Sequence, residues 1–259
     1  MKSETRGEFA RSIALRAGEL IKSADPNKDV LEKGGRGNYV TGADLASEKL
    51  VMNAIRKAYP ADGILSEETS ADIGNVSLER GLWVIDPLDG TNNFRFSRNY
   101  SAVSIGYVEK GVVKLGVAYD PFRQELYYAE HKNGVTLNEK PIQVGSAATL
   151  EKATVATDNS YDHNSTRKNL ETLLKIKKTP WTLMKGSAVL TLCDVATGRV
   201  DFYFHCRLNP WDIAAALLIV QEAGGQAIDF DGKEATFKSP GIAAGNFELV
   251  SEFRELIKA

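Results

Sequence analysis

The residues best suited to chemistry lie in one segment, Trp83 to Phe94, which reads WVIDPLDGTNNF. An apolar run carries Asp86 to the end of a predicted buried strand, and Pro87 disfavours a regular ladder or helix at that point. The chain must turn there, which brings the carboxylates of Asp86 and Asp89 close together. A divalent cation removes their repulsion, and an all-oxygen ligand set suits Mg²⁺ or Mn²⁺ better than zinc. The alternative is a plain Asp-Pro turn on the surface.

The three residues that follow, Gly90, Thr91 and Asn92, are suited to opening a helix. The first N–H groups of a helix have no intrahelical acceptor, and the helix dipole is positive at that end. Such a helix start binds phosphate. The segment therefore predicts a cation site and an anion site side by side.

Further carboxylates follow or begin other predicted elements. Glu67, with Glu68 beside it, comes directly after a short apolar strand, and Asp212 stands at the head of the apolar helix 213–220. Taken singly, Asp212 is typical of an N-cap and the Glu67-Glu68 pair of a solvated loop. Their coincidence with Asp86 and Asp89 favours a metal centre.

The first half of the chain should position most of these carboxylates. The spacing of apolar residues predicts an amphipathic helix over residues 4–23 and a second over 44–59, with Asp44 at its start. A glycine-rich loop, 34–37, lies between them. Strands 63–65 and 82–85 follow, and the alternation of short strands and turns over 102–137 indicates an antiparallel meander.

The second half alternates strands and helices and predicts a mixed or parallel sheet with helical cover. We place the boundary near residue 145, so that 1–145 is an α+β half with the antiparallel sheet and most metal ligands. Residues 146–259 are then an α/β half that supplies Asp212 and a substrate loop. The predicted strands are 154–157, 181–184, 200–205 and 226–230, and the predicted helices are 164–177, 186–196 and 212–223.

Composition excludes several classes of protein. The 259 residues are 43% hydrophobic and 25% charged, which is typical of a globular chain. A net charge of −2 lacks the basic excess of a nucleic-acid binder, so nucleic acid is not an expected partner. The longest apolar run, residues 213–220, is far shorter than the roughly 20 residues of a membrane span. Without the apolar core of a signal peptide at its start, the chain is expected to be cytoplasmic.

Other catalytic motifs are missing from the sequence. It contains neither Gly-x-Ser-x-Gly, typical of serine hydrolases, nor the ATP-binding Gly-x-x-x-x-Gly-Lys-Ser/Thr. None of the three histidines stands in a nucleophile motif. Cys193 and Cys206 indicate buried thiols in a reducing compartment, with a zinc site at Cys206 and His205 as the weaker alternative.

Four segments together resemble a known family. They are SEET at 66–69, WVIDPLDGTNNF at 83–94, PWDIAA at 210–215 and EAGG at 222–225. In order and spacing they resemble the inositol monophosphatase family of metal-dependent, lithium-sensitive phosphatases. The resemblance spans nearly the whole chain and implies the layered αβαβα sandwich of the sugar phosphatases.

The resemblance also implies a ligand set for two or three Mg²⁺ ions, with Mn²⁺ as a substitute. Glu67, Asp86 and the carbonyl oxygen of Leu88 would hold the first ion. Asp86, Asp89 and Asp212 would hold the second, so that Asp86 bridges the two. A third and weaker ion lies near the equivalent of Glu67 in the family.

The same resemblance implies roles in catalysis and substrate binding. Thr91 and Asp44 would orient the attacking water or accept its proton, while Asp212 lies on the side of the leaving alkoxide. Side-chain acid–base catalysis contributes roughly 10²–10⁴-fold, too little for phosphomonoester hydrolysis, so the metal ions must contribute most of the acceleration. The implied phosphate ligands are the amides of Gly90, Thr91 and Asn92; Lys33 would approach the site, and Gly186, Ser187 and Ala188 would contact the polyol or sugar.

Two departures from the family pattern concern the substrate. His205 stands seven residues before Asp212, where members specialised for inositol phosphates usually carry glutamate. A neutral imidazole accepts only one hydrogen bond, which puts a preference for inositol 1-phosphate in doubt. Arg207 could contact a more anionic substrate, and both residues could instead merely finish a strand. Arg95 and Arg98 could favour a second phosphate or could be solvated.

The sequence therefore predicts a Mg²⁺-dependent phosphomonoesterase for a small polyol or sugar phosphate such as inositol 1-phosphate. Fructose 1,6-bisphosphatase or dual-specificity activity is an alternative, and histidinol phosphate stays possible. The segment 89–94 is less similar to the nucleotide branch, which often reads DGTKEF there. A hypothesis of another class is a regulatory binding protein associated with the transcription machinery, as some bacterial relatives are. The family resemblance implies a homodimer.

Overall fold

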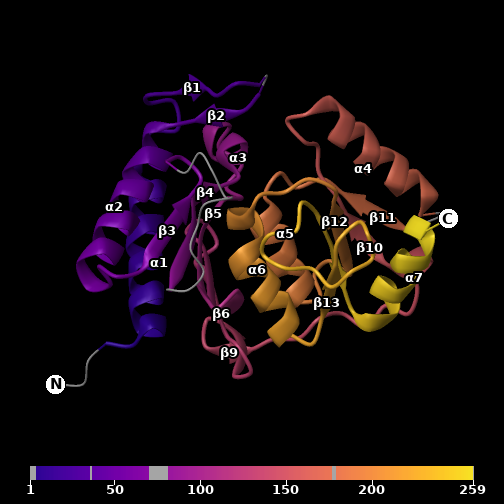
Figure 1. The fold of residues 1–259 in the computed structure, drawn as a ribbon. Helices are drawn as coiled ribbons and strands as arrows, with labels where there is room; N and C mark the ends of the chain where they lie inside the picture. The colour runs from indigo at the N-terminus through magenta and orange to yellow at the C-terminus, as the bar shows by residue number, and fades with distance from the viewer. Residues whose placement is uncertain (1–3, 36, 70–80, 177–178, 259) are drawn as a thin grey trace.

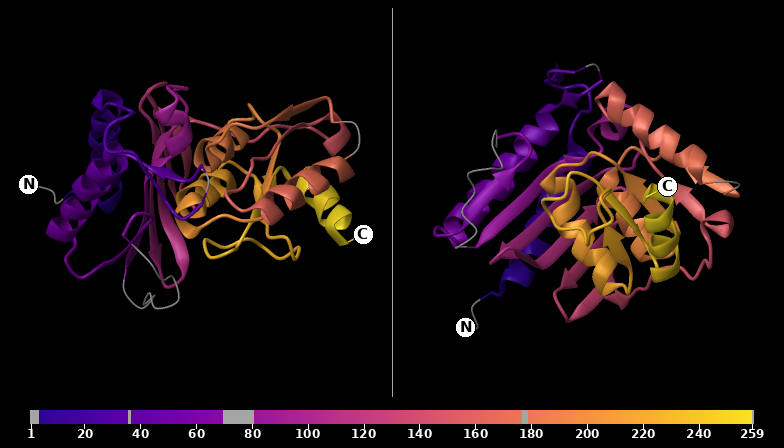
Figure 2. Two further views of the ribbon diagram at one scale, coloured as in Figure 1. Left: turned by 90° about the horizontal axis from the view of Figure 1, so that it is seen from above. Right: turned by 45° about the vertical axis from the view of Figure 1, so that its right-hand side comes forward.

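The structure is a computed structural model that describes residues 4–35, 37–69, 81–176 and 179–258. Five layers follow one another in Figures 1 and 2: a helix pair, a seven-stranded sheet, a second helix pair, a five-stranded sheet and an outer helix layer. Three clusters of buried apolar side chains fill the spaces between these layers. The predicted αβαβα sandwich is confirmed.

The outer helix pair consists of α1 (Arg6–Ser23) and α2 (Gly42–Ala58), which confirms the two predicted N-terminal helices. Each begins with a capping box, in which a threonine side chain and a carboxylate three residues later satisfy orphan amides of the first turn. In α2 this box joins Thr41 to Asp44. The requirements of the helix start therefore fix the position of Asp44.

The glycine-rich loop between these helices is flanked by a short hairpin that the sequence analysis did not predict. Strands β1 (Leu31–Glu32) and β2 (Tyr39–Val40) pair antiparallel around residues 34–37, of which Arg36 lies outside the described residues. The strands are two residues each, too short for a detectable alternation of polar and apolar residues.

The first sheet has the strand order β3-β4-β5-β6-β7-β8-β9, and the antiparallel meander predicted for 102–137 is confirmed. Among the described strand pairs of this sheet, only β3–β4 is parallel. The strands are β3 (Gly63–Ser66), β4 (Leu82–Asp89), β5 (Ala102–Glu109), β6 (Val112–Asp120), β7 (Glu125–Glu130), β8 (Gly134–Leu137) and β9 (Lys140–Pro141).

Strand β4 extends beyond its predicted end. It was expected to stop at Asp86, but it continues to Asp89 with a register shift between these two residues. Asp86 pairs with Ser104 and Asp89 with Ala102 on β5. Pro87, which has no N–H to donate to a neighbouring strand, lies in the irregular stretch between these pairs. Both carboxylates are thus attached to the sheet rather than to a free turn.

The second sheet has the order β11-β10-β12-β14-β13 and is mixed, as predicted, since β14 runs antiparallel to both neighbours. The sequence analysis missed β14 and the final helix α7 (Phe247–Lys258). The predicted end of helix 164–177 also falls outside the described residues. The strands are β10 (Thr154–Ala156), β11 (Trp181–Leu183), β12 (Phe202–His205), β13 (Gln226–Ile228) and β14 (Ile242–Gly245), preceded by a 3₁₀ turn at Leu150–Lys152.

Helices α5 (Ala188–Ala196) and α6 (Pro210–Glu222) lie between the two sheets, and α4 (His163–Lys175) lies with α7 on the outside (Figure 2). Apolar side chains of both sheets join those of α5 and α6 in one cluster. The boundary near residue 145 stays a prediction. No helix within the described residues is long and apolar enough to cross a bilayer.

Candidate metal and phosphate site

Three of the predicted metal ligands meet in space. Oxygen atoms of Asp86, Asp89 and Asp212 lie within 4.8 Å of one another. The first two come from the irregular end of β4 and the third from the first turn of α6. The Ser104 hydroxyl on β5 donates to the main-chain oxygen of Trp211 at 3.4 Å, which ties the start of α6 to this sheet. The contact between sheet and helix therefore assembles the cluster.

The position of Asp212 in α6 shows that the N-cap alternative from the sequence was wrong. It is not an N-cap: Asn209 caps α6, Pro210 occupies the first turn, and Asp212 is the third helical residue. Its Oδ2 accepts the main-chain N–H of Asn209 at 2.7 Å. Because Pro210 lacks an N–H and has a helical φ, it starts the helix two residues earlier than expected.

The cluster has the electrostatics of a cation site. Burial raises the pKa of Asp86, and the charges of Glu67, Asp89 and Asp212 raise it further. Burial also raises the pKa of Asp212, and it raises that of Asp89 to about 7. Like charges in a buried place disfavour one another's ionisation, and a divalent cation reverses this effect. The all-oxygen donor set fits Mg²⁺ or Mn²⁺.

Hydrogen bonds fix how these carboxylates point. Oδ1 of Asp86 accepts the N–H of Leu88 at 3.0 Å, within the irregular stretch of β4. Oδ2 of Asp89 accepts the N–H of Val189 at 3.1 Å and the hydroxyl hydrogen of Ser187. Asp89 is thereby attached to the start of α5, in the other half of the chain.

Glu67 lies at the end of β3, outside the group of three, and is paired with a lysine. Lys33 Nζ is 2.9 Å from Glu67 Oε1 and 2.8 Å from Glu68 Oε1. Burial alone would lower the pKa of Lys33, but the two carboxylates raise it above its usual value. The charge of Glu67 also raises the pKa values of the three aspartates, so it belongs to the same electrostatic site.

Glu68 is a site residue for which the sequence analysis assigned no role. Its side chain is only 5% exposed, and burial together with the Glu67 charge raises its pKa to about 7. Its one signal in the sequence is that it neighbours Glu67.

The predicted Thr91–Asp44 pair is present. The Thr91 hydroxyl lies 2.8 Å from Oδ1 of Asp44 and 3.0 Å from the carbonyl oxygen of Leu88. The other oxygen of Asp44 accepts the N–H and the hydroxyl hydrogen of Thr41. Burial raises the pKa of Asp44 to about 6 despite these hydrogen bonds. A carboxylate next to a hydroxyl, with a pKa near neutrality, is suited to accepting a proton.

The predicted phosphate helix is α3 (Thr91–Arg95), with Gly90 as its N-cap. Gly90 has φ +83°, and a Cβ there would lie 2.9 Å from the carbonyl oxygen of Tyr100, so only glycine fits without strain. The side chain of Asn92 donates to the carbonyl oxygen of Gly37 at 2.9 Å. The glycine-rich loop is therefore attached to the start of α3.

The segment Gly186–Ala188 lies beside this site but not in the predicted form. Helix α5 begins at Ala188 rather than Gly186, because Gly186 has φ +73° and Ser187 is the N-cap. Asp158, which follows β10, accepts the N–H groups of Lys185 and Gly186 at 2.8 and 2.7 Å. The sequence analysis missed Asp158, whose only signal is an acidic residue just past a strand. Contact of this segment with substrate stays a prediction.

His205 and Arg207 have partners within the protein. His205 is 4% exposed, and its Nδ1 accepts the N–H of Arg207 at 3.2 Å. Burial lowers the pKa of His205 to about 4, so the ring is neutral at pH 7. The exposed Arg207 guanidinium lies 3.4 Å from Asp162 at the start of α4. These contacts favour the structural alternative for His205.

Comparison with known proteins agrees with this geometry. An inositol-1-monophosphatase of Synechocystis sp. is 38% identical over 255 residues, which are 97% of this chain and 88% of that protein. A fructose-1,6-bisphosphatase/inositol-1-monophosphatase of Thermotoga maritima is 38% identical over 242 residues, 93% of this chain and 91% of that protein.

The solved structure of the extragenic suppressor protein suhB from Bartonella henselae has the same fold. It superposes with a TM-score of 0.88 at 32% sequence identity, covering 96% of this chain and 97% of that one. The sequence model of the inositol monophosphatase family matches residues 2–258. This chain, with its three clustered aspartates beside the start of α3, belongs to the inositol monophosphatase family.

Proposed function

We propose that this protein is a phosphomonoesterase that hydrolyses a small polyol or sugar phosphate with the help of Mg²⁺. One observation carries the proposal: Asp212 meets Asp86 and Asp89, more than 120 positions earlier in the sequence, beside the start of α3. A cation there balances the carboxylates and the phosphate ester at once. The relatives named as phosphatases support the same activity.

In this proposal Glu67, Asp86 and the carbonyl oxygen of Leu88 would hold one ion, and Asp86, Asp89 and Asp212 would hold another. A third, weaker ion near Glu67 would compete with Lys33 for that carboxylate. When bound, such ions neutralise the phosphate oxygens, lower the pKa of water and stabilise the leaving oxygen. Mn²⁺, which also prefers oxygen ligands, should substitute for Mg²⁺.

In this proposal, side chains and main-chain amides carry out proton transfer and bind the phosphate. The Thr91 hydroxyl passes a proton from the attacking water to Asp44, which is 2.8 Å away and has a pKa of about 6. The N–H groups of Gly90, Thr91 and Asn92 bind the phosphate oxygens and hold phosphorus in line with the water. Gly186, Ser187 and Ala188 are proposed to contact the polyol.

The test is release of inorganic phosphate from a panel of esters. The panel holds inositol 1-phosphate, fructose 1,6-bisphosphate, histidinol phosphate and 3′-phosphoadenosine 5′-phosphate, each with Mg²⁺, Mn²⁺ or EDTA. Mg²⁺-dependent release that EDTA abolishes supports the proposal. Undiminished release in EDTA, or none from any ester, contradicts it. In the latter case a pull-down of transcription proteins would favour the regulatory alternative.

A second candidate activity is hydrolysis of a sugar bisphosphate. The Thermotoga maritima relative carries fructose-1,6-bisphosphatase in its name, and two arginines lie at or just after α3. The guanidinium of Arg95 lies 3.8 Å from the centre of the Tyr39 ring, and that of Arg98 lies 5.4 Å from the Phe96 ring. Arg98→Met should raise the KM for the bisphosphate while leaving that for inositol 1-phosphate unchanged.

The proposal includes the remaining family properties: a homodimer, inhibition by lithium and a cytoplasmic location. Trp181 on the edge strand β11 and Met184 just after it are 65% and 49% exposed, which supports a surface for a second copy. Light scattering coupled to size exclusion measures the oligomeric state. Phosphate release in rising LiCl, with NaCl as the matched control, measures the inhibition.

A further inference from the structure

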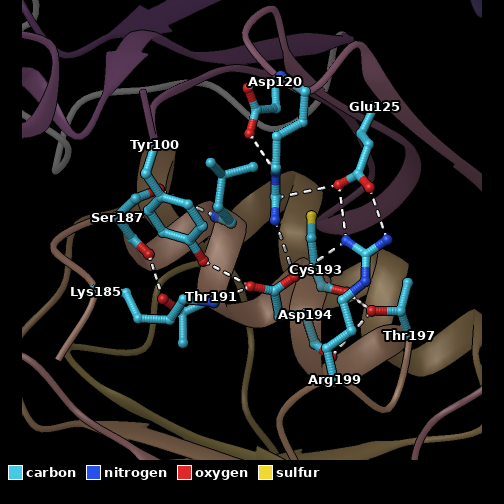
Figure 3. A network of polar contacts seen from close by, with 12 residues as sticks. Tyr100, Asp120, Glu125, Lys185, Ser187, Thr191, Cys193, Asp194, Thr197 and Arg199 are labelled. Carbon is cyan, nitrogen blue, oxygen red and sulfur yellow. Dashed lines mark hydrogen bonds and ion pairs between the residues drawn. The ribbon is translucent and has the colours of Figure 1, made fainter. Parts of the chain in front are cut away.

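A buried polar network next to the metal site has no role in the chemistry described above. Its centre is Asp194 on α5, whose side chain is fully buried. Oδ2 accepts the Tyr100 hydroxyl at 2.8 Å and the ammonium of Lys185, and Oδ1 lies 3.4 Å from Arg199 (Figure 3). Arg123 adds a fourth partner at 3.6 Å. Carboxylates that are buried this deeply need such partners.

Lys185 connects this network to the metal site along the chain. Its ammonium is held by Asp194, and two residues later the Ser187 hydroxyl donates to Oδ2 of Asp89. Ser187 also caps α5 by accepting the N–H of Leu190 at 3.2 Å. The position of residues 185–187 therefore decides where the hydroxyl of Ser187 meets the metal ligand.

Residues 185–187 need anchors, because Gly186 is exposed and has a positive φ. Asn93 of α3 donates to the carbonyl oxygen of Lys185 at 2.7 Å, and Asp158 accepts two of its amides. Those two anchors hold main-chain atoms. The Lys185–Asp194 pair is made by the side chain of Lys185, so it can be removed without changing these main-chain hydrogen bonds.

We propose that Lys185, held by Asp194, is a positioning residue that fixes Ser187 against Asp89 and so sets the affinity of the site for Mg²⁺. The inference rests on the proposed function only in taking Asp89 as a metal ligand. Partners that orient metal ligands commonly change metal affinity 10–100-fold when they are removed. The ammonium of Lys185 pairs with Asp194 rather than with a predicted metal ligand, so its effect passes through the main chain to Ser187.

The test compares Lys185→Met with Arg199→Met. Both variants remove a cation from Asp194, which keeps Tyr100 and Arg123 in either case. Arg199 is otherwise paired with Glu125 at 2.6 Å and lies outside segment 185–187, so it is the matched control. Mg²⁺ binding is measured by titration calorimetry, together with Tm, kcat and the Mg²⁺ concentration at half-maximal turnover.

We expect Lys185→Met to weaken Mg²⁺ binding about 10-fold, with a much smaller fall in kcat at saturating Mg²⁺. Arg199→Met should lower Tm and leave Mg²⁺ binding unchanged. Ser187→Ala should weaken binding at least as much as Lys185→Met, and the double variant no more than Ser187→Ala alone, because both act on one hydrogen bond.

Three results would overturn the inference. They are unchanged Mg²⁺ binding in Lys185→Met, an equal loss in Arg199→Met, and additive losses in the double variant. If Lys185→Met binds Mg²⁺ as the wild type does and the protein releases phosphate, the inference fails but the proposed function stands. A wild-type protein that binds no Mg²⁺ in the calorimeter contradicts both.

Discussion

The hydroxyl of Thr91 lies 2.8 Å from Oδ1 of Asp44, and this contact joins the first turn of α3 to the first turn of α2. The other oxygen of Asp44 is fully used in the capping box with Thr41. One carboxylate thus both starts α2 and accepts the hydroxyl hydrogen of the residue that opens α3. Its orientation is set by backbone capping, so it does not depend on substrate.

Thr91→Ala should lower kcat by about 10²-fold, the usual contribution of positioned proton transfer. The substitution removes the hydroxyl between water and Asp44 and keeps the backbone amide for phosphate. KM should therefore change little. Thr91→Ser is the control, because it restores the hydroxyl, and it should recover most of the rate in a phosphate-release assay. Equal rates for the alanine and serine variants would contradict the proton-transfer role.

Asp212→Asn should separate the metal role from the stability of the fold. Loss of one ligand should reduce Mg²⁺-dependent turnover by more than about 10²-fold, since even indirect partners contribute 10–100-fold. In EDTA the same variant should melt a few degrees higher than the wild type, because it removes one of the repelling charges. Differential scanning calorimetry with and without Mg²⁺ measures both effects, and a lower Tm in EDTA would argue against a repulsive cluster.

The metal-free protein should become more stable as the pH falls from 8 to about 5. In the folded state the pKa of Asp44 is about 6 and that of Asp89 about 7, against about 3.9 for an unfolded aspartate. A raised folded pKa means that the native state binds more protons, so this stabilisation is lost as the pH rises through 6 and 7. His205, with a lowered pKa of about 4, opposes the trend below pH 6.5 but is one group against several carboxylates.

Mg²⁺ should reverse this dependence, because the ion binds the deprotonated carboxylates. At 10 mM Mg²⁺ we expect Tm to rise between pH 5.5 and 7.5, and in EDTA we expect it to fall over the same range. Urea unfolding at fixed ionic strength checks the sign. Parallel pH profiles in Mg²⁺ and in EDTA would show that these carboxylates do not hold the ion.

His205→Ala tests whether the imidazole contacts substrate or the fold. The ring is buried and accepts the N–H of Arg207, so its loss should cost about 1 kcal/mol or more. That corresponds to a fall in Tm of roughly 2–4 °C for a chain of this size. We expect less than a threefold change in KM for inositol 1-phosphate and for fructose 1,6-bisphosphate. A tenfold rise in either KM would instead place the ring at the substrate.

The sequence alone identified the carboxylates that we propose as metal ligands, because they stand where predictable elements begin or end. Asp86 and Asp89 follow the apolar run of β4, Glu67 follows β3, and the Pro210-Trp211-Asp212 segment opens an apolar helix. These signals are local in the chain: a buried strand, a proline at a helix start, a glycine that permits a left-handed φ. The helix pair, the meander and the mixed sheet followed from the same local periodicity.

Only the tertiary structure decided which of these groups touch. The hydrogen bond from Ser187 to Asp89 joins residues 98 positions apart. The buried Asp194 likewise contacts Arg123, from the first half of the chain, and Arg199, from the second. Such contacts depend on how α5 and α6 pack between the sheets, and no local periodicity encodes that packing. The same holds for β14, whose apolar strand forms only between β12 and β13. Local sequence patterns identify the donor and acceptor residues, whereas the packing of distant segments sets the distances between them and their pKa values.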